Sequence, residues 1–529
     1  MNLPHRVVSL VMPRPPETGS TPFLIRYRGL AFLVANVAFM LLTFWGASVW
    51  DSPMWRPLYL CALFALCSAP VLLLTSFNDR YVLLALFMAE YFMIYGLLDF
   101  QSLLLGGQLS TDAEFITPAE VSILIGGIAV LASYVASSGS VRTPHARRAH
   151  RDWSRLTVLV VGLALTAVGS VAYWYFHLVA ATVSSDRATA EALAAMGPTL
   201  TFIVMLGQMV KPLGILLLAY GYARYRTLSW LVCVLAVLAL QIFLGFIGDS
   251  KGIPLQAGAI VVLTRMLVDN RLPRIWIVTS VAVTIILFPI FQAYRADVIG
   301  ERGLNRAQAL QNLGKVIQIA VGNRDKVSQG SPEERTQTIL ERASIKGNVE
   351  ILFSRVGTDT PFQHGHTLID LAFAFIPRLV WEDRPGVSAG QLFNHQVIRG
   401  EGDTDVSPSQ LGELYWNFGW PGVVVGMTLF GALLGVVGAK SNLADGLSAT
   451  RLMITMATVY TLCLGFESAM AITYVVWLRS MAAIGILHVL LARTATAVPV
   501  PVQASCGTLP AKPQQEPAPT VRFPNVLRF

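Results

Sequence analysis

The stretch LSWLVCVLAVLALQIFLGFI, residues Leu228–Ile247, decides the fold class of this chain. It runs for 20 residues without a charged side chain, and an α-helix needs about 20 apolar residues to cross the hydrocarbon core of a bilayer. Inside lipid, every backbone N–H and C=O must be hydrogen-bonded within the protein, which a helix achieves along its own length. The stretch therefore predicts a membrane-spanning helix.

Similar apolar runs occur on both sides of this stretch. The other eleven are Gly29–Trp50, Arg56–Phe77, Tyr81–Phe100, Thr117–Ser138, Leu156–Leu178, Thr199–Tyr222, Ile253–Val268, Ile275–Ala293, Gly419–Gly438, Arg451–Phe466 and Ile472–Leu491. Two of them, Ile253–Val268 and Arg451–Phe466, are short and are expected to be tilted or partly re-entrant. We therefore predict an all-α polytopic membrane protein with about twelve transmembrane helices.

The composition of the 529 residues supports the same fold class. Charged residues make up 13% of the chain and hydrophobic residues 54%, whereas a soluble domain has about 25% charged residues. This composition excludes a disordered protein and a disulfide-stapled secreted domain. The net charge of +8 fits basic cytoplasmic loops, so we expect no nucleic-acid partner.

Positive charge alternates between successive loops. Val141–Arg155 contains five arginines, whereas Gln101–Ile116 contains no Lys or Arg. Because cytoplasmic loops of membrane proteins are enriched in Lys and Arg, we predict that the basic loops and both termini are cytoplasmic. The segment 1–28 is basic and rich in proline, and we expect it to have no cleavable signal.

The predicted spans divide the chain into five parts. They are a cytoplasmic N-terminal segment (1–28), helices 1–9 (29–293), a periplasmic loop subdomain (294–418), helices 10–12 (419–492) and a disordered cytoplasmic tail (493–529). Within the long loop, Leu304–Val321 predicts an amphipathic helix, and a capping box at Ser331 predicts a second helix toward Arg355. Leu368–Trp381 is apolar but too short to span, which predicts an interfacial or re-entrant helix.

Few charged residues interrupt the predicted spans. Glu90, Lys211 and Arg479 are the main examples. Charges at such depth are costly and often belong to transport sites. An internal Glu90–Lys211 pair that fixes helix packing is an equally good interpretation.

Four basic residues at the outer ends of the predicted spans are candidates for binding phosphate. Lys251 lies in the turn Gly248–Gly252, whose glycines allow backbone N–H groups to approach an anion. Arg295, Arg355 and Arg378 each lie near apolar or aromatic residues in the sequence. Arginine binds phosphate oxygens in a bidentate manner, so the four could hold a diphosphate headgroup. The alternative is that each contacts lipid phosphates individually.

The outer loop also contains candidates for proton transfer and sugar binding. His364 or His366 could act as a general base, and Glu413 could deprotonate a sugar hydroxyl or orient an arginine. The aromatic side chains of Tyr415, Trp416, Phe418 and Trp420 could stack on sugar faces, or belong to the interfacial aromatic belt. Of these, Tyr415 and Trp416 are the residues predicted to bind sugar. His364 and His366, two residues apart, could share a metal ion with His395 or Asp370. Nothing else in the sequence has the spacing of a metal site, so we expect neither a metal nor a cofactor.

Two motifs resemble those of bacterial polysaccharide repeat-unit polymerases of the O-antigen polymerase (Wzy) type. The stretch IPRLVWEDRP, residues 376–385, is similar to their P-R-x-x-W-x-x-K-P element. The stretch SQLGELYWNFGWPG, residues 409–422, is similar to their G-E-x-Y-x-N-F-G-x-x-G element. Lys251 stands where these polymerases more often have Arg, and Arg384 where they usually have Lys. The resemblance covers roughly residues 248–438.

The resemblance implies a GT-C-like membrane glycosyltransferase in the bacterial inner membrane. Its substrates would be undecaprenyl-diphosphate-linked oligosaccharides, which it would polymerise into O-antigen, capsule or exopolysaccharide at the periplasmic face. Partners would include a flippase and a chain-length regulator. Fixed cations would stabilise the diphosphate leaving group. The alternatives are an O-antigen-type ligase, which uses another acceptor, and a transporter or flippase of lipid-linked oligosaccharides.

Overall fold

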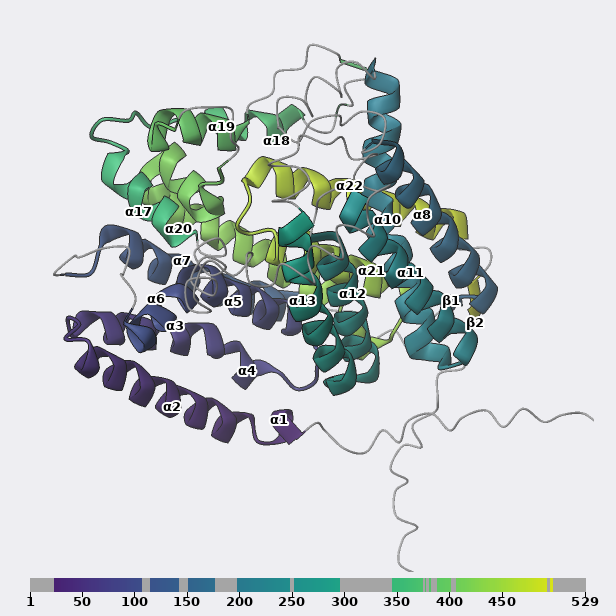
Figure 1. Ribbon diagram of the computed structural model, residues 1–529, viewed down its shortest axis with the longest axis horizontal. Coiled ribbons are helices and arrows are strands. Elements are labelled where there is room, and N and C mark those ends of the chain that lie inside the picture. Colours follow the sequence, from purple (N-terminus) through teal and green to yellow (C-terminus); the bar gives the residue numbers. More distant parts are fainter. Residues whose placement is uncertain are drawn as a thin grey trace, which may run out of the picture.

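The computed structural model is built almost entirely from helices (Figure 1). It describes residues 23–106, 115–141, 151–176, 197–247, 252–294, 345–373, 388–400, 406–491 and 495–497, together with Ile376, Val380 and Trp381. The predicted helices at Leu304–Val321 and after Ser331 lie outside these residues. The loop helix that is described, α17 (Lys346–Arg355), ends at Arg355.

The described part contains these elements in chain order. The first half contains α1 (Phe23–Arg26), α2 (Arg28–Val49), α3 (Trp55–Ser68), α4 (Pro70–Leu73), α5 (Val82–Tyr95), α6 (Leu97–Leu105), α7 (Pro118–Ser140), β1 (Arg151–Trp153), α8 (Arg155–Tyr175), α10 (Gly197–Tyr225), α11 (Leu228–Ile247), α12 (Gly252–Asp269) and α13 (Arg274–Tyr294). The second half contains α17 (Lys346–Arg355), η3 (His366–Leu368), α18 (Ile369–Phe373), α19 (Ala389–Phe393), η4 (Asn394–Ile398), α20 (Ser409–Lys440), η5 (Leu443–Asp445), α21 (Ala449–Thr458), η6 (Val459–Cys463), α22 (Met470–Leu491) and β2 (Ala495–Ala497).

The prediction of a polytopic all-helical membrane protein is confirmed. Nine helices of the described part are long and apolar enough to cross a membrane, and a bent pair, α5 with α6, makes ten. This pair bends by 48° at Gly96, within the predicted run Tyr81–Phe100. The predicted run Arg451–Phe466 is instead a ten-residue helix, α21, followed by the π-helical turn η6. The described residues therefore contain nine or ten candidate spans, and the predicted number of twelve is not established.

Small residues pack the spans in two close pairs. In α20, Gly431 and Gly435 have the G-x-x-x-G spacing, and a Cβ at either would lie 2.6 Å from a backbone oxygen of α7. In α10, a Cβ at Gly207 would lie 2.5 Å from the Cβ of Ala172 on α8. Because the hydrophobic effect contributes little between helices inside lipid, such close backbone contact is a main source of helix association.

The two pairs belong to two separate cores of buried side chains. One core joins α2, α3, α5, α7, α17 and α20, and the other joins α8, α10, α11, α12, α21 and α22. Figure 1 shows α2 to α7 on the left, α8, α10 and α11 on the right and α12 and α13 between them, with the loop elements α17, α18 and α19 above α2 to α7. The described part of the long loop packs on the first core, because buried residues of α17 and α19 belong to that core.

The ends of the helices that carry the basic loops meet on one side of the molecule. The strands β1 and β2 pair there, antiparallel, so the loop before α8 contacts the segment after α22. Buried Asp152 accepts hydrogen bonds from the Tyr220 hydroxyl and from the Ala449 N–H, at 3.1 Å for the latter. This places the ends of α10 and α21 beside β1. We call it the strand side.

A break in α20 separates the outer loop layer from the membrane span. Gly419 has φ +64° and ψ −151°, a backbone region that is essentially restricted to glycine. Pro421 follows, where its fixed φ suits the first turn of a new helix. The segment before the break is almost entirely buried, and the segment after it begins at the residue predicted for the tenth span.

Candidate functional site

A hydrogen-bonded polar cluster in the loop layer joins two stretches singled out from the sequence. The N–H of Gln363 donates to the Trp416 carbonyl at 3.0 Å, and the N–H of His364 donates to the Asn417 carbonyl at 3.1 Å. The N–H of Gly365 donates to the Asn417 side-chain oxygen at 2.8 Å. The turn 363–367, which we call the histidine turn, is thereby fixed to the end of the first segment of α20.

The Glu413 side chain connects this cluster to α22 through its two carboxylate oxygens. Its side chain is fully buried. One carboxylate oxygen accepts the Thr367 hydroxyl at 2.8 Å, and the other accepts the backbone N–H of Met470, at the start of α22, at 2.7 Å. Asn417 donates to both the Thr367 hydroxyl oxygen and the Glu413 carbonyl, each at 2.7 Å. Glu413 therefore links the histidine turn, α20 and α22.

His364 and His366 are the exposed members of the cluster. His364 adopts a left-handed backbone with φ +49°, and Gly365 follows with φ +90°. This conformation is uncommon for a non-glycine residue, and the hydrogen bonds to Asn417 hold it in place. Both imidazole side chains are open to the surroundings, whereas the Glu413 carboxylate is covered. Proton transfer from this cluster is therefore best served by the histidines.

An apolar groove of about 510 Å³ begins beside the histidine turn and follows α20 into its membrane span. Leu368 and Phe418 lie at the turn end, and Leu433 lies farthest along the span. Pro421 to Leu433 covers roughly 18 Å at 1.5 Å per residue. Tyr474 contributes the one polar side chain of the lining. The groove can accommodate an extended hydrocarbon chain.

The aromatic residues of the motif are divided between the core and the surface. Tyr415 is 9% exposed and stacks on Phe353 with ring centroids 3.6 Å apart, and Trp416 is fully buried against Phe393. Phe418 and Trp420 are 47% and 37% exposed. The aromatic faces that a sugar can reach belong to Phe418 and Trp420, two residues that the sequence could not distinguish from their neighbours.

Of the four candidate phosphate-binding residues, only Arg355 belongs to the part of the chain that the structure describes. Arg355 donates from its guanidinium to the carbonyls of Val397 and Ile398, at 3.3 Å for the latter. It therefore caps the C-terminal end of η4 while remaining half-buried. Lys251, Arg295 and Arg378 lie outside the described residues, so their role in binding diphosphate stays a prediction.

Sequence reasoning missed a buried ionic cluster beneath the loop layer. The Lys346 ammonium on α17 binds the carboxylates of Asp99 on α6 and Glu120 on α7, the latter at 2.6 Å, and lies 3.4 Å from Glu350. It also lies 5.2 Å from the centroid of the Tyr59 ring. The T-P-A-E capping box at residues 117–120 was the available signal, because its Glu120 is the N3 residue of α7.

Burial and the neighbouring carboxylates have opposite effects on the pKa of Lys346. Burial lowers the pKa of Lys346, but the nearby charges of Asp99, Glu120 and Glu350 outweigh burial, and the pKa is raised above its usual value. Burial is also the main reason why the pKa of Glu350 is raised. The cluster therefore stays ionised at Lys346 and fastens α17 to two spans.

Glu90 and Lys211 do not form the ion pair that the sequence allowed. Glu90 is half-buried on α5, with Glu467 as a neighbouring charge. Lys211 is 4% exposed on α10, and its ammonium lies 4.5 Å from the centroid of the Tyr173 ring. None of the salt bridges of the described residues joins the two. Lys211 instead lines a cavity with Arg479.

The chain matches no protein-family model, no curated protein and no solved structure among those compared. The candidate site therefore rests on its own geometry: a fixed turn with two exposed histidines, at the end of an apolar groove, on a polytopic all-helical membrane protein.

Proposed function

We propose that this protein is a glycosyltransferase that polymerises undecaprenyl-diphosphate-linked oligosaccharide repeat units into surface polysaccharide. The observation that carries the proposal is the groove along α20 that ends at the histidine turn. A lipid-linked glycan needs a track for its hydrocarbon chain and polar groups where the chain meets water, and the groove and the turn provide them in that order. The proposal includes a GT-C-like arrangement of about twelve spans in the bacterial inner membrane.

The reacting groups follow from this placement. The polyprenyl chain would lie along Leu433, Leu429 and Phe418, so its diphosphate would leave the groove beside His364 and His366. One imidazole would accept the proton of the acceptor sugar hydroxyl as that oxygen attacks the anomeric carbon of the donor. The bond to the diphosphate breaks at the same carbon, and the departing diphosphate carries the negative charge.

The leaving group needs positive charge near the turn. Lys251, Arg295, Arg355 and Arg378 are the residues proposed to supply it, because fixed cations stabilise a diphosphate more as its bond breaks than before. Glu413 and Asn417 are proposed as positioning residues that hold the turn. Phe418 and Trp420 would offer aromatic faces to the sugars, whereas the other two candidates, Tyr415 and Trp416, are buried.

The experiment is a polymerisation assay with purified protein in liposomes and a lipid-diphosphate-linked oligosaccharide. His364→Ala and His366→Ala should shorten or abolish the product ladder, with a loss of about 10²-fold for the residue that acts as general base. His488→Ala is a matched control, because His488 is an exposed histidine near the opposite end of α22. A double histidine variant that folds and forms full-length polymer would refute the assignment.

A ligase would use the same groove and turn with a different acceptor. Offering the reconstituted protein lipid A core or a second repeat unit as acceptor separates the two reactions. Transfer to lipid A core alone would replace polymerase with ligase. Arg295→Ala and Arg378→Ala should reduce either reaction if these arginines hold the diphosphate.

A transporter of lipid-linked oligosaccharides is the second candidate, and the cavity at Lys211 and Arg479 favours it. Both cations lie within membrane spans, where a translocated headgroup would pass. Transport would depend on Lys211 and Arg479 and would survive removal of His364 and His366. Measuring transfer of a labelled lipid-linked oligosaccharide across liposomes containing these two sets of variants separates the candidates.

A further inference from the structure

The histidine turn has different neighbours at its two ends. At one end, Leu368 and Phe418 line the apolar groove. At the other end, the side-chain amide of Gln363 donates a hydrogen bond to the side-chain oxygen of Gln396 at 2.7 Å. Gln363 is the first residue of the turn, and Gln396 belongs to η4. The groove and η4 are therefore reached from different ends of the turn, with its two exposed histidines between them.

Two polar links join the loop before the histidine turn to η4. The Gln363–Gln396 pair is one link. In the other, the Arg399 guanidinium donates to the Asp359 carboxylate at 2.6 Å, and the two side chains are 57% and 46% exposed. The Thr360 hydroxyl donates to the backbone carbonyl of Gln396 at 3.3 Å. We call the side chains of Asp359, Gln363, Gln396 and Arg399 the η4 surface.

The backbone beside the η4 surface is held in an unfavourable conformation. Arg399 has φ +62°, and His364, which follows Gln363, has φ +49°. Such left-handed backbone is uncommon outside glycine, and it is found most often at functional sites. Both side chains are exposed. Because an exposed ion pair such as Asp359–Arg399 adds little to stability, fold stability alone does not account for this conformation.

The proposed polymerisation needs a place for a second oligosaccharide. The inference rests on that proposed function, in which the sugars of one lipid-linked unit attack the anomeric carbon of another. The groove accommodates a hydrocarbon chain, and Tyr474 is the one polar side chain of its described lining. It therefore offers few hydrogen bonds to sugar hydroxyls, and the acceptor sugars have to reach the histidine turn from another direction.

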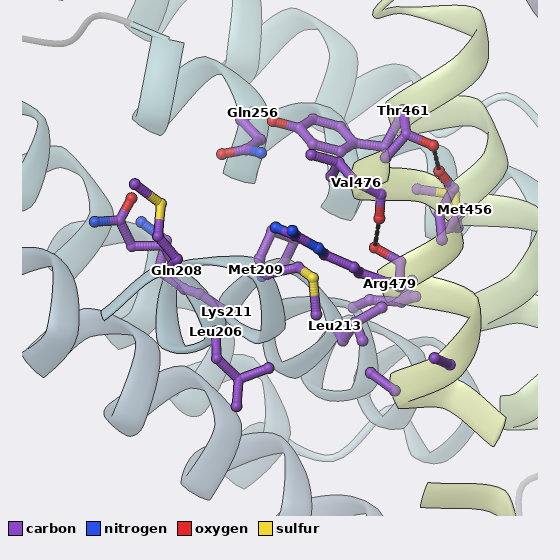
Figure 2. Close-up of a pocket in the computed structure, with 18 of the residues that line it drawn as sticks. Leu206, Gln208, Met209, Lys211, Leu213, Gln256, Met456, Thr461, Val476 and Arg479 are labelled. Carbon is purple, nitrogen blue, oxygen red and sulfur yellow. Dashed lines mark hydrogen bonds between the residues drawn. The ribbon is translucent and has the colours of Figure 1, made fainter. Parts of the chain in front are cut away.

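The cavity between the spans is not suited to the acceptor sugars. It has a volume of about 540 Å³, and Figure 2 shows the Arg479 side chain extending from α22 into the space between the helices. Phe202 and Ile486 line it and are 40% and 60% exposed on membrane spans. An oligosaccharide entering past these residues would leave water for hydrocarbon and lose its hydrogen bonds to water. The exposed η4 surface requires no such transfer.

We propose that the η4 surface binds the acceptor oligosaccharide and places its non-reducing end at His364 and His366. Sugar hydroxyl groups both donate and accept hydrogen bonds. The η4 surface offers both kinds of partner, because its carboxylate and amide oxygens accept while its amide and guanidinium N–H groups donate. The planar guanidinium of Arg399 can contact two neighbouring oxygens at once. The donor's hydrocarbon chain and the acceptor's sugars then approach the histidines from different ends of the turn.

The test uses the oligosaccharide without its lipid. A strain lacking this protein should accumulate the lipid-linked repeat unit. Mild acid releases the oligosaccharide, which is labelled with a fluorophore at its reducing end. Its binding to the full-length protein in nanodiscs is measured by fluorescence anisotropy. The wild type should bind it, Arg399→Gly should weaken binding about tenfold and Gln396→Leu about threefold, as expected for the loss of a charge-assisted and a neutral hydrogen bond.

A matched arginine on the strand side serves as the control. Arg399→Gly removes the guanidinium while glycine adopts the left-handed backbone without strain. Arg226 has the same features, with φ +49° and a salt bridge to Asp269 at 2.9 Å, but lies at the end of α10 on the strand side. Arg226→Gly should therefore leave oligosaccharide binding unchanged. Elution of each variant in size-exclusion chromatography shows whether it is folded.

The outcomes separate this inference from the proposed function. If the strain lacking the protein accumulates no lipid-linked oligosaccharide, the proposed function fails and the inference fails with it. If the oligosaccharide accumulates but the wild type does not bind it, or a folded Arg399→Gly Gln396→Leu double variant binds it equally well, the inference alone is overturned. Equal weakening by Arg226→Gly and Arg399→Gly would also overturn it, because the effect would not come from the η4 surface.

Discussion

Two buried lysines in this protein have opposite surroundings. Lys346 and Lys211 are equally buried, at 4% exposure each. Lys346 lies among Asp99, Glu120 and Glu350 in the loop layer. Lys211 lies within a span, against an aromatic ring and beside a cavity that contains a second cation and no carboxylate in its described lining.

The difference indicates different roles for the same side chain. A buried charge is costly unless partners compensate it. At Lys346 the compensation comes from the chain itself, so the lysine fastens α17 to α6 and α7. At Lys211 the described contact is the cation–π interaction with the Tyr173 ring. Stability measurements should therefore separate the two lysines.

The largest effect is expected from breaking the Lys346 cluster. Lys346→Met leaves three acidic groups around an uncharged side chain, and removing one partner of a buried ion pair costs about 3–5 kcal/mol. We expect a lower Tm in thermal unfolding followed by tryptophan fluorescence, and less folded protein after detergent extraction. Lys440→Met serves as the control on a lysine that is exposed. An unchanged Tm would show that the cluster does not hold α17.

A smaller effect is expected from the pH dependence of the Lys346 cluster. Because burial raises the pKa of Glu350, ionising this residue is less favourable in the folded state than in the unfolded state. Its contribution therefore favours folding at low pH and is lost as pH rises through the raised pKa. Glu350→Gln should raise Tm slightly near neutral pH and leave it unchanged near pH 4, with the two scans compared at equal ionic strength. A lower Tm near neutral pH would mean that the contact with Lys346 dominates.

The smallest effect on stability is expected at Lys211 itself. Lys211→Met keeps roughly the length of the side chain and leaves no carboxylate of the described lining without a partner. The free energy of unfolding should therefore change by less than about 1 kcal/mol, with a correspondingly small change in Tm. A large fall in Tm in lipid-free detergent would show that Lys211 stabilises the fold as Lys346 does.

Much of the fold could be predicted because apolar length is a local property. The run Leu228–Ile247 has the same bounds as α11, and the predicted start at Gly419 coincides with the break in α20. The bend at Gly96 could not be read from hydropathy, because both halves of the run are apolar. The π-helical turn after α21 was missed for the same reason.

The candidate site was less accessible to prediction because it depends on contacts between distant residues. Glu413, His364 and His366 could be selected from residue type, but burial of Glu413 under Thr367 and Met470 depends on how α20 meets α22. Tyr415 and Phe418 stand in one motif, yet only the packed structure distinguishes the covered ring from the exposed one. The partners of Lys346 lie 226 and 247 residues away.

The break at Gly419 has a consequence for how the protein would respond to its membrane. A span tilts when the thickness of the surrounding bilayer changes, and a continuous helix would transmit that tilt to every residue in it. Because the hydrogen-bonded backbone is bent at Gly419, we expect the part of α20 after the break to tilt while Glu413 and Asn417 stay in place. The histidine turn would then keep its shape in thin and thick membranes alike.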